Sequence, residues 1–168
     1  LQVTISSAKI NSQGGLFTTK ADPYLELSVD GQPPRKTEVI KKTWTPSWND
    51  HFTVLVTPYS KLDFRVMNHF QLKSDVVLGE VTLDLNQLLH KNEGKFENVQ
   101  HKCDLKLKGS SNKTGELNIA LNGMSVNMEN FPPRRQNGVA NGPSSRSGGT
   151  RPRNSRRSTD SGTSSGAA

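Results

Sequence analysis

Residues 76–85 read VVLGEVTLDL, a stretch in which apolar and polar side chains largely alternate. A period of two is typical of a strand with one buried face and one exposed face. The same alternation recurs in seven other stretches, so the sequence predicts eight strands. The predicted strands cover residues 1–10, 23–30, 35–40, 51–56, 61–68, 76–85, 101–108 and 115–124.

The connections between these stretches are rich in residues that favour turns, such as residues 30–34 (DGQPP) and residues 45–47 (TPS). Glycine, proline and aspartate set the special backbone angles that turns require. Eight short strands joined in this way predict an all-β fold, an eight-stranded antiparallel β-sandwich. Helical spacing occurs over residues 85–91, where Asp84 is available as a cap. One face of this short helix would carry Leu85, Leu88 and Leu89.

Residues 129–168 hold almost no apolar side chains. Burial in such a segment does not offset the entropy of ordering, so we predict a folded domain over residues 1–128 and a disordered linker rich in Arg, Ser, Gly and Pro over residues 129–168. Seven arginines against two carboxylates give the linker a charge of +5 out of the chain's +7, which leaves +2 for the domain. The basic character of the chain therefore says little about the domain.

Ser155 and Ser158 follow arginines in the linker, an arrangement that basophilic kinases accept. Phosphorylation at these two candidate sites would offset much of the local positive charge. Attraction of the arginines to nucleic acid is the rival interpretation and predicts steep salt dependence. Because no aromatic side chains are interleaved with the arginines for stacking, we expect no specific nucleic-acid partner.

Cys103 is the chain's single cysteine, which excludes an intramolecular disulfide. It alternates with Leu105 and Leu107, so we interpret it as a buried strand residue and not as a nucleophile. The sequence has no leader of the secretory type and no apolar run long enough to span a membrane. Since Leu1 already lies within an alternating stretch, we expect a fragment of a longer, cytoplasmic protein whose membrane contact is peripheral.

The sequence offers no arrangement of residues that is typical of catalysis. No nucleophile is paired with a base, no glycine-rich phosphate loop follows a strand, and no His/Cys spacing suits zinc. The histidines have no supporting residues around them; they are His51, His69, His90 and His101. We therefore predict no enzyme activity for this chain.

Three segments follow one another along the chain: residues 20–27 (KADPYLEL), residues 36–52 (KTEVIKKTWTPSWNDHF) and residues 77–81 (VLGEV). Together they resemble the C2 domain family, which implies a β-sandwich that docks on membranes or on partner proteins. Within these segments, we interpret Trp48 as a buried anchor between the sheets and Gly79 as a position whose backbone angle other residues resist.

A narrower resemblance rests on residues 56–69 (VTPYSKLDFRVMNH) and residues 72–79 (LKSDVVLG), with residues 115–117 (GEL) and 121–123 (LNG) near the end of the domain. These segments look like the N-terminal domain of HECT-class ubiquitin ligases of the group that contains Itch, the WWP proteins and Suppressor of deltex. The resemblance implies a parent protein that transfers ubiquitin through a catalytic domain outside this chain.

The same resemblance allows a test for calcium, which takes about 6–8 oxygen ligands. Asp22 matches the family's second aspartate, but the first would fall near Leu16, where no carboxylate occurs. In the other loop Asp75 is displaced by one residue, and the expected aspartate positions hold Asn68, Phe70 and Val76. The remnants Asp22, Asn68 and Asp75 carry too little charge, so we predict no functional calcium site and no cofactor.

Apolar side chains stand at the same loop tip, and they are Leu16, Phe17, Phe70 and Leu72. They either fold back onto the core or contact a bilayer. The sharper hypothesis is that Phe17 and Phe70 insert, each contributing up to ~2 kcal/mol if fully buried.

A second possible lipid surface consists of four cations that flank the strand predicted at residues 35–40, namely Arg35, Lys36, Lys41 and Lys42. Anionic lipid attracts each well-placed cation by ~1 kcal/mol. Lysines that protect a solvated strand edge from aggregation would give the same pattern.

The leading hypothesis is therefore a monomeric, non-catalytic C2 domain that binds anionic phospholipid membranes without calcium and localises a HECT-type ubiquitin ligase. The alternative is a protein-interaction module that binds substrates or holds the ligase's own catalytic domain inactive.

Overall fold

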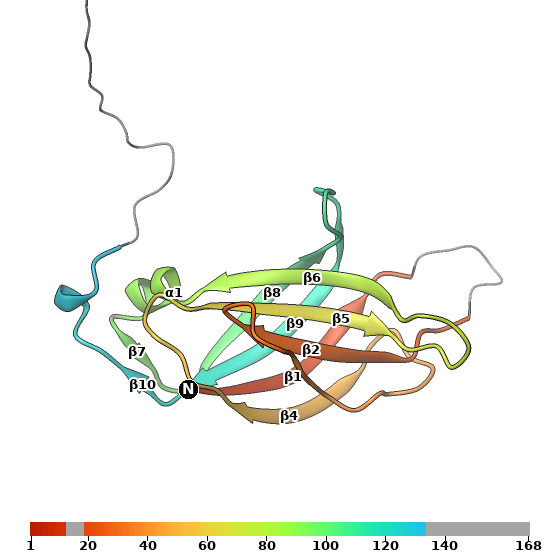
Figure 1. Cartoon of the computed structure of the whole chain (residues 1–168), viewed down its shortest axis with the longest axis horizontal. Coiled ribbons are helices and arrows are strands. Elements are labelled where there is room, and N and C mark those ends of the chain that lie inside the picture. The colour runs from red at the N-terminus through yellow and green to blue at the C-terminus, as the bar shows by residue number, and fades with distance from the viewer. Residues whose placement is uncertain (13–18, 134–168) are drawn as a thin grey trace, which may run out of the picture. The chain divides into compact units, whose positions relative to one another are not determined.

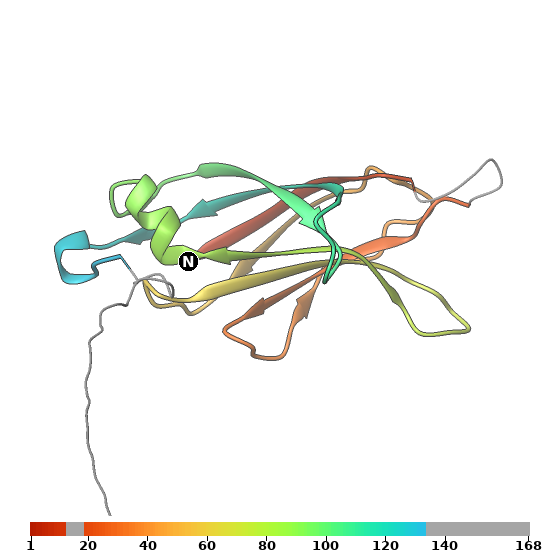
Figure 2. The same cartoon turned by 90° about the horizontal axis from the view of Figure 1, so that it is seen from above.

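The structure is a computed structural model that describes residues 1–12 and 19–133. Eight strands form one sheet that curls into two layers (Figure 1), and the view from above separates these layers (Figure 2). One layer has the order β3-β2-β5-β6 and the other has the order β8-β9-β1-β4. The strands are β1 (Gln2–Ile10), β2 (Pro23–Val29), β3 (Arg35–Lys36), β4 (Ser47–Thr53), β5 (Lys61–Asn68), β6 (Val76–Asp84), β8 (Val99–Lys106) and β9 (Lys113–Asn122).

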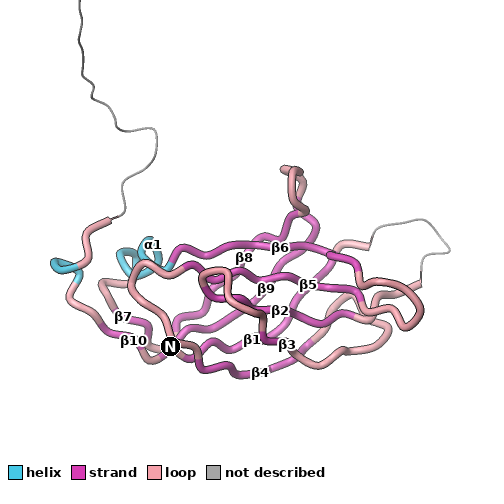
Figure 3. Tube along the Cα trace, viewed as in Figure 1, coloured by secondary structure: helices cyan, strands magenta, loops and turns pink. Residues whose placement is uncertain are grey.

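The layers meet where β6 and β8 pair through Glu80 and Lys106. All pairings between the eight strands are antiparallel. The predicted all-β, eight-stranded antiparallel sandwich is thus confirmed over the described residues, and strands dominate them (Figure 3). The predicted linker after Pro133, with Ser155 and Ser158, lies outside the described residues.

The core lies between the layers and follows from the alternation in the sequence. In β5, for example, Leu62, Phe64 and Val66 are buried, whereas Lys61 and Arg65 are exposed. Burial of such side chains is the dominant favourable contribution to folding. The largest fully buried side chains are Phe64, Phe96, Ile5, Leu25, Leu27, Leu62, Leu85, Leu89, Leu105, Leu117, Ile119 and Leu121.

The predicted helix is confirmed as α1 (Leu85–Lys91). The Asp84 side chain caps it by accepting a hydrogen bond from the Asn86 N–H at 3.0 Å, which satisfies one of the free donors of the first turn. The helix ends at Asn92, whose N–H donates to the carbonyls of Leu88 and Leu89. The predicted apolar face, made of Leu85, Leu88 and Leu89, is buried.

Two strand predictions differ from the observed bounds by more than two residues. The strand predicted at residues 35–40 ends at Lys36, because the Thr37 hydroxyl accepts the Leu25 N–H at 2.8 Å in place of a ladder carbonyl. The strand predicted at residues 51–56 is β4, which starts at Ser47 since that residue pairs with Ser7 of β1. Three short elements were not predicted: β7 (Lys95–Phe96), β10 (Met124–Ser125) and the 3-10 helix η1 (Met128–Asn130).

The interpretations of Gly79 and Trp48 also need correction. The φ of Gly79 is not in the left-handed region. Instead, a Cβ there would lie 2.6 Å from the Thr114 Oγ1 and 2.8 Å from the Leu105 Cβ, so glycine is required for close packing between the layers. Trp48 is only half-buried, because it stands on the edge strand β4 and packs against the margin of the core.

Most connections gather at the two ends of the sandwich, whereas the β8–β9 connection projects from its side (Figure 1). At one end lie the described parts of the β1–β2, β3–β4 and β5–β6 connections, which comprise residues 11–12 and 19–22, 37–46 and 69–75; we call this end the tip. At the opposite end, called the far end, lie α1, residues 54–60 and residues 126–133. The tip carries most of the site residues predicted from the sequence.

Candidate functional site

Asp22 joins the three tip connections. Its Oδ1 accepts the Lys42 N–H at 2.8 Å, and its carbonyl accepts the His69 N–H at 3.0 Å. Its own N–H donates to the Asn68 Oδ1 at 2.9 Å. The structure therefore brings Asp22 and Asn68 together, but it uses their polar atoms to fasten the connections to one another.

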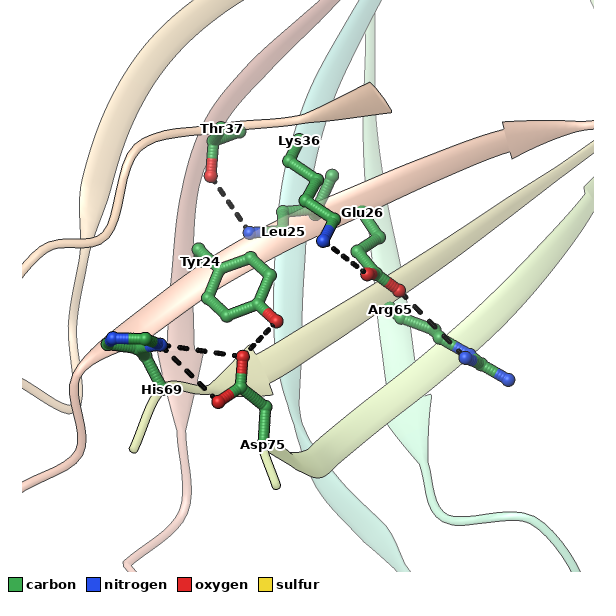
Figure 4. Close-up of polar contacts among 8 residues, drawn as sticks. All are labelled: Tyr24, Leu25, Glu26, Lys36, Thr37, Arg65, His69 and Asp75. Carbon is green, nitrogen blue, oxygen red and sulfur yellow. Dashed lines mark hydrogen bonds and ion pairs between the residues drawn. The ribbon is translucent and has the colours of Figure 1, made fainter. Parts of the chain in front are cut away.

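Asp75 has a similar structural role within residues 69–75. Its carboxylate accepts hydrogen bonds from the Tyr24 hydroxyl and, at 3.0 Å, from the Phe70 N–H. His69 Nδ1 lies 3.3 Å from Asp75 Oδ1, and the Tyr24 and His69 rings meet edge to face at 6.4 Å (Figure 4). The Tyr24 hydroxyl and then the Phe70 N–H lower the pKa of Asp75, while burial and the bond to Asp75 raise the pKa of Tyr24. Asp75 thus closes the β5–β6 connection on itself.

The described residues contain no group of three or more His, Cys, Asp or Glu side chains that could hold a metal ion. Calcium needs several oxygen ligands at once, whereas an Asp22 oxygen and both Asp75 oxygens already accept bonds from the protein. This donor set fits calcium poorly.

The apolar residues of the tip differ in exposure. Leu72 is 99% exposed, so it does not fold back onto the core. Phe70 is half-buried, and the Lys73 Nζ lies 4.2 Å from its ring centroid. Leu16 and Phe17 lie outside the described residues. Leu72, which the sequence ranked below Phe70, is therefore the more prominent apolar group.

The four cations predicted as a second lipid surface lie on two consecutive segments of the chain. Arg35 donates from Nη1 to the Thr53 carbonyl at 2.7 Å, and its guanidinium lies 4.9 Å from the Phe52 ring centroid. Lys36 lies 3.6 Å from Glu26 (Figure 4). Both are on β3, whereas the other two, Lys41 and Lys42, lie exposed in the β3–β4 connection at the tip.

Two further exposed lysines at the tip were missed by the sequence reasoning. Lys20 lies in the β1–β2 connection and Lys73 follows Leu72 in the β5–β6 connection. Their proximity to Asp22 and Phe70 in the sequence was the available signal. We call Lys20, Lys41, Lys42 and Lys73 the tip lysines; the salt bridges found in the described part of the chain do not include them.

Cys103 and His51 have structural roles. Cys103 is buried as predicted, and burial raises the pKa of its thiol to about 12. His51 Nδ1 is hydrogen-bonded to the Thr4 hydroxyl at 2.8 Å. Within residues 1–12 and 19–133, no helix is both long and apolar enough to cross a membrane.

A β-sandwich whose connections converge on one end, with lysines and a protruding leucine there, is a binding module. Residues 1–100 match the C2 domain family, and the chain belongs to that family. The predicted C2 domain is thereby confirmed, and a C2 domain alone is not catalytic.

The relatives fall into two groups. The chain is 38% identical over 85 residues to extended synaptotagmin-1 of Rattus norvegicus, covering 49% of this chain and 8% of the relative. It is 36% identical over 69 residues to the E3 ubiquitin-protein ligase pub3 of Schizosaccharomyces pombe, covering 40% and 9%. It is 29% identical over 141 residues to the E3 ubiquitin-protein ligase RSP5 of Emericella nidulans, covering 83% and 17%. The chain therefore spans less than a fifth of the length of these relatives.

Solved structures agree on the fold. The first C2 domain of plant extended synaptotagmin 1 superposes with a TM-score of 0.58 at 24% identity, covering 70% of this chain and 88% of that one. The predicted family is thus confirmed, while relatives of both groups leave the narrower ligase group as a proposal.

Proposed function

We propose that this C2 domain docks on anionic phospholipid membranes through its tip and does so without calcium. The observation that carries the proposal is Leu72, an apolar side chain that is 99% exposed and is followed directly by Lys73. An exposed apolar group beside cations suits the boundary between the headgroups and acyl chains of a bilayer.

The expected energies support an orientation in which the tip faces the membrane. Full burial of one leucine contributes ~2 kcal/mol, and each lysine close to anionic lipid contributes ~1 kcal/mol. The tip lysines come from all three connections, so one flat membrane surface can meet several of them together with Leu72. The lysine contribution falls with salt, whereas the leucine contribution does not.

Calcium independence is supported by the way in which the carboxylates are used. A calcium ion is held by several oxygen ligands at once, carboxylates among them. Here Asp22 and Asp75 join the tip connections through bonds to Lys42, Tyr24 and Phe70. A tip that is already fastened by the protein needs no ion to bring its connections together.

The test is co-sedimentation with vesicles made of equal parts phosphatidylserine and phosphatidylcholine, in calcium and in a calcium chelator. We expect equal binding in both and little binding to phosphatidylcholine alone. Leu72→Ala should weaken binding by about tenfold, corresponding to the loss of ~1.4 kcal/mol. Leu55→Ala is the matched control, because Leu55 is 96% exposed but lies in the β4–β5 connection at the far end.

Two outcomes would sink the proposal. Binding that appears only with calcium would mean that a calcium ion bridges the domain and the lipid. Equal weakening by Leu72→Ala and Leu55→Ala would remove the tip as the docking surface.

A narrower part of the proposal concerns the parent protein. We propose that the domain localises a HECT-type ubiquitin ligase in the cytoplasm, because the match to the ligase RSP5 of Emericella nidulans extends over 83% of this chain, against 49% for extended synaptotagmin-1 of Rattus norvegicus. The full-length protein should then form a thioester with ubiquitin when mixed with a charged conjugating enzyme. A full-length protein that forms no such thioester would be assigned to the other group of relatives.

A further inference from the structure

The tip contains a cavity of about 430 Å³. It is bordered by the β1–β2 connection, the β3–β4 connection, β5, β6 and the connection that joins these two strands. Its walls include Trp44, Phe70, Val76, Val77, Leu78 and Leu107. This volume lies within the ~300–1,000 Å³ that is usual for small-molecule pockets.

Two exposed apolar side chains line the cavity. Among the described residues the large exposed apolar side chains are Leu55, Leu72, Val76 and Leu107. Val76, at 46% exposed, and Leu107, at 37%, both line the cavity. Leu72 stands on the connection that also supplies Phe70. Apolar side chains that stay exposed at a cavity are candidates for contact with a ligand.

The cavity is lined by one lysine and one aspartate, and a second lysine stands beside it. Lys20 and His69 line it, and Lys73 lies over the ring of Phe70. The carboxylate of Asp22, which also borders the cavity, accepts the Lys42 N–H at 2.8 Å. Apolar walls with cations beside them favour a ligand that has an apolar chain and an anionic head.

We propose that this cavity takes the acyl chain of one anionic lipid, with the headgroup phosphate beside Lys20. This inference rests on the proposed function, because that orientation turns the cavity towards the bilayer. A chain lodged between Trp44 and Phe70 would attach the domain to a single lipid molecule, in addition to the attraction of the lysines to the membrane surface.

Trp44 provides a direct readout. The chain has two tryptophans, so Trp48→Phe leaves Trp44 as the sole emitter. The probe is monomeric lysophosphatidylserine with bromine atoms on its acyl chain, which quench a tryptophan that they contact. We expect saturable quenching of Trp44, and none with glycerophosphoserine, which has the same headgroup and no chain. Unbrominated lysophosphatidylserine should compete with the quenching.

Two variants in the Trp48→Phe background test the location of the probe. Val76→Phe adds bulk at a partly exposed position of the cavity wall and should raise the dissociation constant of the probe by about tenfold, a change of ~1.4 kcal/mol. Leu55→Phe makes a similar change at an exposed site of the far end and should leave quenching unaltered. Circular dichroism verifies that both variants fold.

Absence of quenching would overturn the inference, because it would mean that the cavity is filled by the protein itself. Quenching that Val76→Phe leaves unchanged would also overturn it, as non-specific binding. The results distinguish failure of one proposal from failure of the other. Vesicle binding without quenching would exclude only the acyl-chain site, whereas quenching without vesicle binding would exclude only membrane docking.

Discussion

The two ends of the sandwich each carry an almost fully exposed leucine, Leu72 at the tip and Leu55 at the far end. Around Leu72 the tip lysines come from three connections. The grooves beside the two leucines each contain one carboxylate and one cation, Asp30 and Arg35 beside Leu55 and Asp22 and Lys73 beside Leu72, so the difference lies in the further tip lysines on the neighbouring connections. The difference teaches that exposure of one apolar side chain does not define a docking surface, and that the charge around it decides.

The ends also differ in construction. At the far end, α1 buries its leucines and Tyr59 packs edge to face on Phe131. At the tip, side-chain oxygens of Asp22 and Asp75 hold the connections through backbone N–H groups. We therefore expect substitutions at the far end to change stability, and substitutions at the tip to change binding.

The largest effect should come from Leu89→Ala in α1. Leu89 is fully buried, and truncation of such a leucine lowers the free energy of unfolding by about 2–5 kcal/mol. Urea denaturation measures the change. Leu72→Ala should remain within about 0.5 kcal/mol of the parent protein. Comparable losses of unfolding free energy in both variants would contradict the expectation that the far end determines stability and the tip determines binding.

Gly79→Ala should lower the free energy of unfolding by about 1–3 kcal/mol. Its new Cβ meets the Thr114 Oγ1 and the Leu105 Cβ at the seam between the layers. Thr114→Ala in the same chain should recover part of the loss, because it removes the nearer contact. Unchanged stability in Gly79→Ala would show that β6 can move away from β8 and β9.

A smaller effect should distinguish two domain boundaries. The Tyr59 hydroxyl donates to the Pro132 carbonyl at 2.9 Å, and its ring lies 6.2 Å from that of Phe131. A chain that ends at Met128 should therefore be less stable by about 0.5–1.5 kcal/mol than one that ends at Pro133. Phe131→Ala in the longer chain should give part of the loss. Identical denaturation midpoints would support a boundary at residue 128.

The smallest effect is a local pKa change at the tip. Tyr24→Phe removes the hydroxyl that contributes most to lowering the pKa of Asp75, so this pKa should rise towards 3.8. A group with a lowered pKa stabilises the fold at pH values above its unfolded pKa, and that stability is lost as the pH falls through the folded pKa. The Phe70 amide should therefore lose its bond only at a pH below the ordinary pKa of an aspartate, and at a higher pH in Tyr24→Phe than in the parent protein. NMR titration of the Phe70 amide and of the Asp75 carboxyl measures this in both proteins. Coincident titration curves for Tyr24→Phe and the parent protein would exclude a contribution from the Tyr24 hydrogen bond.

The sequence predicted the sandwich because alternation in stretches such as residues 61–68 reports directly which side chains are buried. It could not predict why Gly79 is glycine, since the side chains that approach it belong to strands distant in the chain. It ranked Phe70 above Leu72 because loop exposure depends on how Asp75 folds residues 69–75, and that depends on Tyr24, about fifty residues away. The local sequence pattern therefore predicted the strands, whereas the conformation of the tip depends on polar contacts between residues that are distant in the chain.

The contact between Tyr59 and residues 131–132 determines how far from the tip the described chain ends. It fixes the end of the described chain beside residues 54–60, opposite the tip. β1 has 9 residues, and a strand of that length spans about 30 Å. With the tip in a bilayer, the domain acts as a rigid spacer. Pro133 would then stand at about this height above the lipid, set by the length of the strands.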